Sequence, residues 1–473
     1  MNYIFFFPDE LRAESLSVYG HPGIKTPGFD RLARDGVTFE QCHVQNTVCS
    51  PSRCSLVTGQ YVHSYGHRSL WNLIKPYECN LFRYMKDAGY EVRIYSKNDL
   101  FAAESIPLST DVFEHIGGYR QKAGPQSIQP LETCNDFLFK PMEGSYREHN
   151  DYRNLLAGME FIKGRKYGDK PFVLFLPLVF PHCPYTAQEP YYSMYDENEI
   201  SALRPVCDNK PEYHGLIRRY RNLEKANLEK IQAVYMGMTS FTDTLLGELM
   251  DCVEEAGIKE ETLLIASSDH GDYAGDYGLV EKWPSGCEDV LTRVPLLISG
   301  PECKKGHRVA GQVELFDIMA TIMESAGIKA RHTHYARSLW PQLKGAAGDP
   351  DRAVFCEGGY NKNEYHCNEG ADLPSRSFMR GPETIYYPKG LQQREHPESV
   401  GRATMIRILT HKLVLRTYGI NELYDLAEDP RELNNVYGEK TYAGIQAELE
   451  RRMLDWYIAT SDSVPFEENS REL

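Results

Sequence analysis

The chain has 473 residues, of which 41% are hydrophobic and 25% are charged, an ordinary composition for a soluble globular protein. This length suffices for one large α/β domain and a smaller one, and no apolar run reaches the roughly 18 residues that a membrane span requires. The net charge of −15 argues against nucleic acid and broad polyanion-binding surfaces. It still allows a small anionic ligand in a local cationic pocket.

The amino terminus and the cysteines bear on the cellular compartment. The apolar stretch at residues 1–8 is short and lacks both a basic segment and a small-residue cleavage site, so it predicts a strand and not a signal peptide. The twelve cysteines show neither paired CxxC zinc spacing nor a dense disulfide framework. We therefore expect a cytoplasmic protein whose cysteines are mostly reduced and buried.

The first half of the chain alternates short apolar runs with helix-like segments, which is typical of a parallel sheet covered on both faces. A helix begins near Thr26, and a long amphipathic helix is predicted at about residues 222–256. The predicted strands of the large sheet are residues 3–7, 36–39, 90–95, 170–179, 262–267, 294–299 and 353–357.

Three polar stretches rich in glycine and proline interrupt this pattern, at residues 117–150, 185–213 and 358–400. Loops this long in a compact domain are usually functional or disordered, and we interpret them as walls of a substrate pocket. Beyond them we predict antiparallel strands at 404–409 and 412–417 and a terminal helix at 442–458. The predicted architecture is a large α/β domain, 1–375, with a small α+β subdomain, 376–473.

The most informative stretch is Cys49-Ser50-Pro51-Ser52-Arg53. Ser50 suits a helix N-cap and Pro51 suits the first helical position. Cys49 would then lie just before a helix N-terminus, where free N–H groups and the helix dipole attract anions. Arg53 follows one turn later, and its planar fork of donors suits a tetrahedral oxyanion. For one pentapeptide, a buried cysteine near a surface arginine remains the alternative.

This stretch resembles the signature of the type I sulfatase family, Cys-x-Pro-x-Arg followed by a Thr-Gly turn, here Thr58-Gly59. The family belongs to the alkaline phosphatase superfamily, so the resemblance implies that kind of α/β fold. It also implies that a formylglycine-generating maturation enzyme oxidises Cys49 to formylglycine, which hydrates to a geminal diol. One hydroxyl of the diol would attack sulfur and release the alcohol, and the second would lose its proton as sulfate is expelled.

Acidic residues follow two of the predicted strands. Asp9 and Glu10 come directly after the first strand, and Asp269 and His270 follow a later one. Open α/β sheets bind ligands at the carboxyl ends of their strands, and carboxylates with one imidazole suit a hard cation. The resemblance implies that these four residues and modified Cys49 hold calcium or a similar divalent cation. Glu10 departs from the aspartate or glutamine that the family commonly has.

Three further residues match positions at which the family binds sulfate or assists the leaving group. Lys97 lies in a Ser-Lys-Asn-Asp-Leu segment similar to the family's Gly-Lys-x-His-Leu. His182 follows a strongly apolar strand, and Lys282 lies beyond the Asp-His-Gly motif. The resemblance implies that both ammonium groups offset the sulfate charge and that His182 and Lys282 can donate to the departing oxygen. Singly, each would more often be a surface lysine or a packed histidine.

Asp99 is the clearest departure from the family pattern. The family commonly has a histidine at this position, which contacts the diol and serves as the base for sulfate release. Either a raised pKa lets Asp99 accept the proton, or another group such as His67 takes over that role.

Two other interpretations stay open. A phosphonate monoester or phosphodiester hydrolase of the same superfamily can share both motifs, but tends to carry an uncharged residue in place of Lys97. A catalytically silent metal-binding protein on this fold is the other. The expected substrate is a small sulfate ester, of a mono- or oligosaccharide or of a phenol, and the three long loops would select among them.

Overall fold

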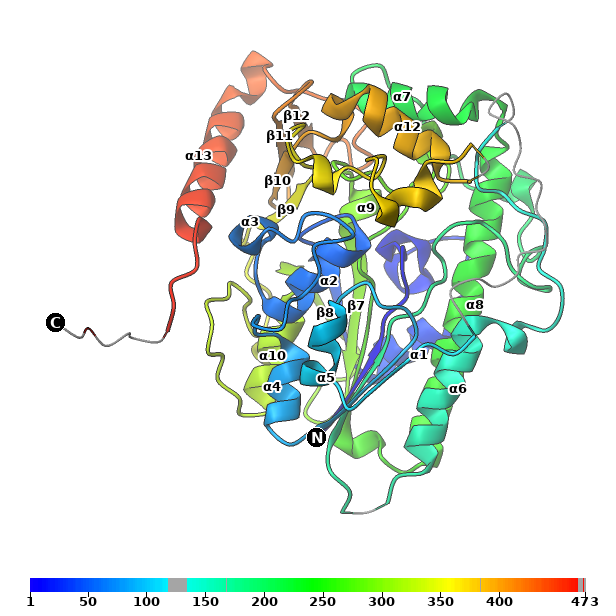
Figure 1. Ribbon diagram of the computed structural model, residues 1–473, viewed down its shortest axis with the longest axis vertical. Helices are drawn as coiled ribbons and strands as arrows, with labels where there is room; N and C mark the ends of the chain where they lie inside the picture. Colours follow the sequence, from blue (N-terminus) through cyan, green and yellow to red (C-terminus); the bar gives the residue numbers. More distant parts are fainter. Residues whose placement is uncertain (118–133, 167, 383, 467–470, 472–473) are drawn as a thin grey trace.

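Residues 1–117, 134–166, 168–382, 384–466 and 471 are described by the computed structural model (Figure 1). The strands are β1 Asn2–Phe6, β2 Val37–His43, β3 Glu91–Tyr95, β4 Val112–Glu114, β5 Phe172–Leu176, β6 Thr262–Ser267, β7 Arg293–Ser299, β8 His307–Glu314, β9 Val354–Gly358, β10 Ala403–Arg407, β11 His411–Arg416 and β12 Glu422–Asp425. The α-helices are α1 Pro27–Asp35, α2 Cys49–Thr58, α3 Val62–Tyr65, α4 Leu81–Asp87, α5 Ile106–Ser109, α6 Asn150–Lys163, α7 Glu212–Arg221, α8 Leu228–Glu255, α9 Asp289–Thr292, α10 Asp317–Ser325, α11 Trp340–Leu343, α12 Tyr387–Glu395 and α13 Ala443–Thr460. Within these ranges no helix has the length and apolar composition needed to cross a bilayer.

A mixed eight-stranded sheet has the order β4-β3-β5-β1-β6-β7-β2-β8. β7 runs antiparallel to both of its neighbours, and the other strand pairs of this sheet are parallel. Helices cover both faces, with α1, α6 and α8 on one side and α2, α4 and α10 on the other (Figure 1). This arrangement confirms the predicted α/β class with a mostly parallel sheet.

The central strand β1 shows why the sheet needs two covering layers. All five of its residues are buried. Ile4 and Phe6 pack into the core shared with α1, α6 and α8, whereas Tyr3 and Phe5 pack into the core shared with α2, α4 and α10. Successive side chains of a strand point to opposite faces, so an uninterrupted apolar run requires apolar partners on both.

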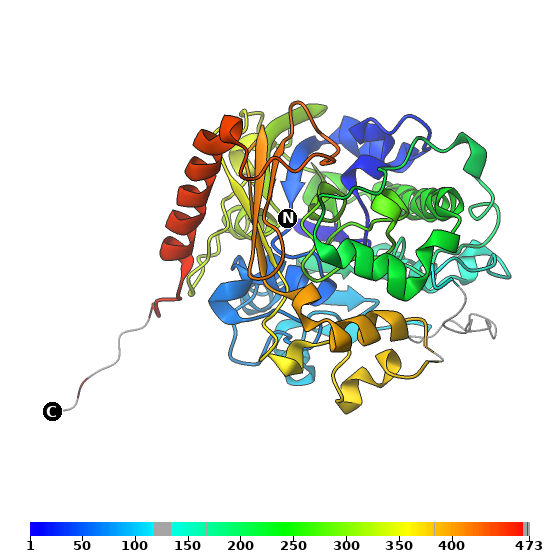
Figure 2. The same ribbon diagram turned by 90° about the horizontal axis from the view of Figure 1, so that it is seen from above.

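A second, antiparallel sheet of order β12-β11-β10-β9 lies beside the large one, and α13 runs along it (Figure 2). Phe355 of β9 stacks on Trp456 of α13 with ring centroids 4.4 Å apart, within a separate apolar core. The predicted antiparallel pair and terminal helix are both present. The predicted division at residue 375 stays a prediction.

The strand prediction places one strand in the wrong sheet and lacks three others, β4, β8 and β12. The run at residues 353–357 is predicted in the large sheet, but β9 pairs with β10 in the small sheet, with Phe355 opposite Ile406. A five-residue apolar run suits either sheet, and only the partner strand decides between them. β8 has no counterpart in the prediction, because His307 and Arg308 at its start hide the apolar pattern.

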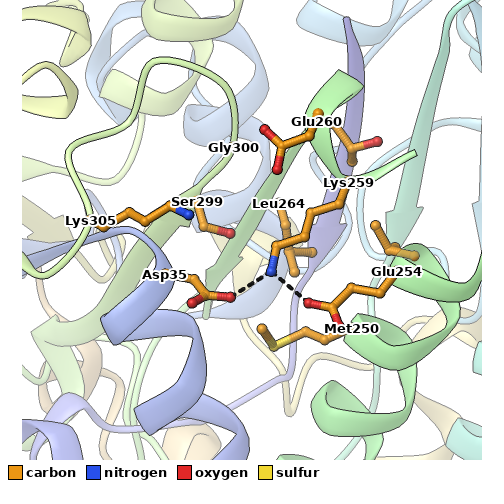
Figure 3. Close-up of a pocket in the computed structure, with 11 residues that line it drawn as sticks. Asp35, Met250, Glu254, Lys259, Glu260, Leu264, Ser299, Gly300 and Lys305 are labelled. Atoms are coloured by element: carbon orange, nitrogen blue, oxygen red, sulfur yellow. Dashed lines mark hydrogen bonds and ion pairs between the residues drawn. The ribbon is translucent and has the colours of Figure 1, made fainter. Parts of the chain in front are cut away.

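A small cleft lies where β6 begins and β7 ends (Figure 3). Its volume is about 40 Å³. Lys259 crosses it to pair with Asp35 at 2.8 Å and Glu254 at 2.5 Å. A space this small holds a few waters and no organic substrate. The groups with catalytic potential lie at the opposite edge of the sheet, where β1 and β6 end.

Candidate active site

The loops that follow β1 and β6 meet at the carboxyl ends of these strands, which pair in parallel. Asp9 follows β1 and Asp269 follows β6. The hydroxyl of Ser268 ties the two loops together, because it accepts a hydrogen bond from Leu11 N at 3.0 Å and donates one to Pro8 O at 2.9 Å. The structure therefore brings the two predicted acidic motifs to one point.

Cys49 approaches the same point from α2. The sequence predicts Cys49 just before the helix, but α2 begins at Cys49 itself, with Val48 as the N-cap. Val48 N donates to Asn46 Oδ1 at 2.8 Å, which fixes the entry of the chain. Cys49 is 3% exposed, and Ser52 Oγ donates to Asp269 O at 2.6 Å. The helix start is thus buried and bound directly to the β6 loop.

Arg53 links the two aspartates through one oxygen of each. Its Nε donates to Asp269 Oδ2 at 2.7 Å and its Nη2 donates to Asp9 Oδ2 at 2.9 Å. Lys97 also pairs with Asp9 Oδ2. Burial would raise the pKa of Asp9, but Lys97 and Arg53 hold it well below its usual range. The aspartate is therefore ionised, and its second oxygen, Oδ1, is left for another cation.

His270 turns one ring nitrogen towards Oδ1 of Asp9 and Oδ1 of Asp269. Its Nδ1 donates to Gly271 O at 2.8 Å, so Nε2 carries the lone pair. Nε2 lies 3.3 Å from Cys49 Sγ, 3.6 Å from Asp9 Oδ1 and 3.9 Å from Asp269 Oδ1. Burial lowers the pKa of His270, which favours the neutral form that binds metals.

These four ligand atoms fit a divalent cation. They lie within 4.8 Å of one another. Bonds of about 2.4 Å at right angles separate neighbouring ligands by about 3.4 Å, close to the contacts just described. The sulfur of Cys49 stands where an oxygen of a modified residue would lie, so the cluster offers two carboxylates, one imidazole and that oxygen.

Glu10 lies apart from this cluster, unlike the prediction. Its N–H donates to Asp269 Oδ1 at 3.3 Å, but its side chain faces Lys282, with which Oε1 pairs. Glu10 forms a second group of potential ligands with His182 and Cys183. Its backbone φ of 62° is unfavourable for a glutamate and directs the carboxylate away from Asp9. The ion pair with Lys282 accounts for one oxygen, while Oε2 is buried without a hydrogen-bond partner.

His182 and Lys282 form a directed pair. His182 Nδ1 donates to Cys183 O at 2.5 Å, so its Nε2 accepts from Lys282 Nζ at 2.9 Å. Burial and the ammonium of Lys282 lower the pKa of His182 to about 3, which keeps the imidazole neutral. Lys282 is therefore the member of the pair that carries a proton to donate, whereas the sequence leaves that role to either residue.

The comparisons with known proteins agree with this geometry. Residues 1–328 match the family model described as Sulfatase, and residues 380–458 match the model of the N-sulphoglucosamine sulphohydrolase C-terminal region. The chain belongs to the sulfatase family. This confirms the resemblance that the Cys49 motif carries, within the alkaline phosphatase superfamily.

Relatives of this sulfatase span nearly its whole length. The multifunctional alkaline phosphatase superfamily protein PehA of Trinickia caryophylli is 25% identical over 97% of the chain and 93% of its own length. The arylsulfatase of Clostridium perfringens is 26% identical, with coverages of 93% and 91%.

Among solved structures, the phosphonate monoester hydrolase of Agrobacterium radiobacter has a TM-score of 0.77 at 22% identity, covering 97% of this chain and 96% of its own. BT4656, in complex with its substrate D-glucosamine-2-N,6-O-disulfate, has a TM-score of 0.73 at 19% identity, covering 97% and 98%. At these identities the structures establish the shared fold.

Asp99 pairs with Lys97 at 2.8 Å and keeps about a quarter of its side chain exposed. Burial would raise the pKa of Asp99, but Lys97 and Arg53 lower it below the usual value. Of the two possibilities from the sequence, the raised pKa is therefore wrong, and Asp99 is ionised. Ser96, immediately before Lys97, has a φ of 124°, which is unfavourable for a serine.

His67, the other candidate base of this sulfatase, is engaged elsewhere. Its Nδ1 bonds Asn72 O at 2.6 Å, and its Nε2 lies 3.4 Å from Glu78 Oε1. Burial lowers the pKa of His67, but Cys54 and Glu78 outweigh it and raise the value well above the ordinary one. A protonated histidine cannot accept a proton, so His67 does not fit that role.

The long loops supply residues that the sequence does not single out. The segments around Leu138 and Tyr185 run side by side, and helices α7 and α12 lie above the carboxyl ends of the strands (Figure 1). From α12, Lys389 reaches Glu281, the neighbour of Lys282. In the sequence, the one hint of this contact is that the acidic residue Glu281 precedes Lys282. Residues 118–133 and 383 of the predicted loops lie outside the described residues.

Proposed function

We propose that this sulfatase hydrolyses sulfate esters of small organic or saccharide alcohols with a formylglycine made from Cys49. The observation that supports this most directly is the buried start of α2, where Cys49 lies 3.6 Å from Asp9 Oδ1 and 3.3 Å from His270 Nε2. Asp9, Asp269, His270 and modified Cys49 would hold the cation, and calcium suits their oxygen-rich set. When bound, such a cation supplies positive charge that stabilises the oxygens of the ester.

The first chemical step uses Lys282. One hydroxyl of the hydrated formylglycine gives its proton to the carboxylate of Asp9, which lies beside Cys49, and attacks sulfur. The bond between sulfur and the alcohol oxygen breaks, and Lys282 gives a proton to that oxygen. Lys282 is 4% exposed, so bulk water has little access to the ammonium that donates this proton. Arg53 and Lys97, beside Asp9, offset the charge of the sulfate oxygens.

The second step releases sulfate. The remaining hydroxyl loses its proton, the carbon–oxygen bond to sulfate breaks, and the aldehyde forms again. We assign proton acceptance to Asp99, because it is ionised and lies next to Lys97. A carboxylate with a lowered pKa is a weak base, so this step should be slower than in a relative with histidine at the position.

A sulfated mono- or oligosaccharide is the substrate class that we propose. The support is the fold shared with BT4656, whose structure is in complex with its disulfated glucosamine substrate, and the match of residues 380–458 to a sulphohydrolase carboxy-terminal model. The test uses enzyme coexpressed with a formylglycine-generating enzyme. Peptide mass spectrometry should show modified Cys49, and a panel of sulfated sugars and aryl sulfates should include hydrolysed members. Turnover without the modification would sink the proposal.

A second candidate is a phosphonate monoester hydrolase. The phosphonate monoester hydrolase of Agrobacterium radiobacter favours it, since it shares its fold and most of its length with this chain. Against it stands Lys97, whose ammonium lies within the site, because phosphonate monoester hydrolases of the superfamily tend to carry an uncharged residue at this position. Matched aryl sulfate and aryl phosphonate esters decide between the two, because the preferred ester has the higher kcat/KM.

A further inference from the structure

We propose that Lys389 of α12 positions the catalytic ammonium of Lys282 by holding the carboxylate of Glu281 away from it. The inference rests on the proposed function, in which Lys282 protonates the leaving group. It makes the carboxy-terminal helix part of the machinery, although Lys389 touches no substrate. Lys389 is therefore a positioning residue.

Glu281 lies between three buried cations. Lys389 Nζ contacts its Oε1 at 2.8 Å, and Arg221 Nη2 contacts its Oε2 at 3.1 Å. Lys282 Nζ lies 4.0 Å from the same Oε1, just beyond hydrogen-bond distance. The four side chains are 2–4% exposed, so water cannot take the place of a missing partner. Each oxygen of Glu281 thus has its own cation, and Lys282 remains free to contact Glu10 and His182.

The main chain of Glu281 is held in place, so only its side chain can move towards or away from Lys282. Glu281 has a φ of 64°, which is unfavourable for a glutamate. Its N–H donates to Tyr185 Oη at 2.9 Å, and its C=O accepts from Tyr273 N at 3.0 Å. Because the main chain is held on both sides, only the torsions of the Glu281 side chain decide whether it meets Lys282.

Lys389 and Arg221, the two cations that pair with Glu281, lie on helices outside the large sheet. Lys389 is also 3.4 Å from Glu369 Oε2, which accepts from Gln393 Nε2 at 2.6 Å. Lys389 and Gln393 lie on α12, and Arg221 lies at the end of α7, against which α12 packs. The position of α12 therefore sets the distance between Glu281 and Lys282.

Replacing Lys389 by Met tests the inference. Glu281 then has one oxygen without a cation and turns to Lys282, which draws the ammonium from Glu10 and His182. Protonation of the leaving group suffers most where the departing alkoxide is most basic. We expect kcat for poor leaving groups to fall by about 10²-fold, and kcat for activated aryl sulfates to fall by less than about threefold. KM should change little.

The measurement is the slope of log kcat against leaving-group pKa across a series of aryl and alkyl sulfates. Lys389→Met should steepen it, and the double variant Lys389→Met/Glu281→Gln should restore it, because the competing charge is gone. If Lys389 had only a structural role, kcat would fall by the same factor for every leaving group and would fall further in the double variant. Lys389→Gln removes the charge with a smaller change in shape and should shift the slope in the same direction.

Lys412→Met is the matched control. Lys412 is fully buried and pairs with Asp289 at 2.5 Å and with Glu432, in the region of the small sheet. Its loss should reduce stability and leave the slope unchanged. An unchanged slope in both Lys389 variants, or a double variant no better than the single one, overturns the inference. A matured wild type that hydrolyses no sulfate ester overturns the proposed function instead.

Discussion

Two buried clusters adjoin Cys49, and they differ in how their charges are arranged. The cation cluster consists of Asp9, Asp269, His270 and Arg53. The lysine cluster consists of Glu10, His182, Lys282, Glu281 and Lys389. In the first, each aspartate gives one oxygen to Arg53 and keeps the other for a shared centre. In the second, each acid is paired with a lysine, and Lys282 carries the proton that the proposed first step uses.

The largest effect should follow from removing the group between the two clusters. Cys49→Ala abolishes formation of the formylglycine, and we expect kcat to fall by about 10⁵-fold or more. Circular dichroism should show an intact fold, because the change removes one sulfur atom. The control is Cys54→Ala in the same helix, which is also buried but contacts backbone carbonyls of Asn72 and Leu100 and the side chain of His67. It should retain turnover, and equal activity of both variants would contradict the mechanism.

The cation cluster is tested by Asp269→Asn and by chelation. The amide keeps the size of the side chain but weakens the site for a divalent cation, and we expect about a 10³-fold loss of activity. Calcium should restore chelated wild type but not the variant at the same concentration. The matched control is Asp276→Asn, another buried aspartate, which pairs with Arg12 at 2.6 Å and Arg204 at 3.1 Å away from Cys49. Its activity should stay calcium-dependent.

The cation cluster was largely predictable from the sequence, for a physical reason. Asp9 and Asp269 follow apolar strands directly, and the ends of adjacent parallel strands bring such residues together. Cys49 and Arg53 lie one helical turn apart in a recognisable motif. The structure changes only the details, since α2 begins at Cys49 and the guanidinium of Arg53 engages the two aspartates.

The lysine cluster was only partly predictable. His182 and Lys282 matched family positions, but Glu281 and Lys389 are 108 residues apart and meet because α12 folds over the strand ends. Glu10 has a positive φ, and no pattern in the neighbouring sequence predicts it. The misassigned strand β9 has the same cause, since pairing over long sequence separations decides which sheet a short apolar run joins.

Lys97 connects the cation cluster to substrate choice. In the proposed mechanism the ammonium of Lys97, beside Asp9, would stabilise the oxygens of a sulfate ester, and loss of one preorganised contact of this kind typically costs about 10²–10³ in turnover. Lys97→Ala should therefore reduce kcat/KM for an aryl sulfate by about that factor and change kcat/KM for the matched aryl phosphonate much less. A wild type that prefers the phosphonate, with a ratio unmoved by the mutation, would favour the second candidate function.

Asp99→Asn probes the release of sulfate. If Asp99 accepts the proton of the second hydroxyl, we expect the sulfated enzyme to accumulate and steady-state kcat to fall by about tenfold. Rapid-quench kinetics should show a burst of alcohol of about one equivalent per active site, and intact mass should show the added sulfate. A normal rate without a burst would assign the proton to another acceptor.

The smallest effect concerns stability and tests the charge balance of the lysine cluster without substrate. Burial would raise the pKa of Glu281, but Lys389, Lys282 and Arg221 lower it to about 2, from 4.5 for an unperturbed glutamate. A lowered pKa means that the folded state favours the ionised form. Its contribution is therefore present above about pH 4.5 and is lost as the pH falls towards 2, and a shift of this size corresponds to about 3 kcal/mol.

Glu281→Gln removes that titration. The difference in the free energy of unfolding between wild type and variant, from urea titrations between pH 3 and pH 7, should grow as the pH rises through this range and level off above about pH 5. The amide leaves Lys389 and Arg221 as two neighbouring cations without their shared carboxylate, which adds to the loss at neutral pH. A difference that stays constant with pH would mean that the three cations do not act on Glu281 as their positions indicate. Glu281 would then not be stabilised by being shared among several cations, and the proposed balance of charges in the lysine cluster would be wrong.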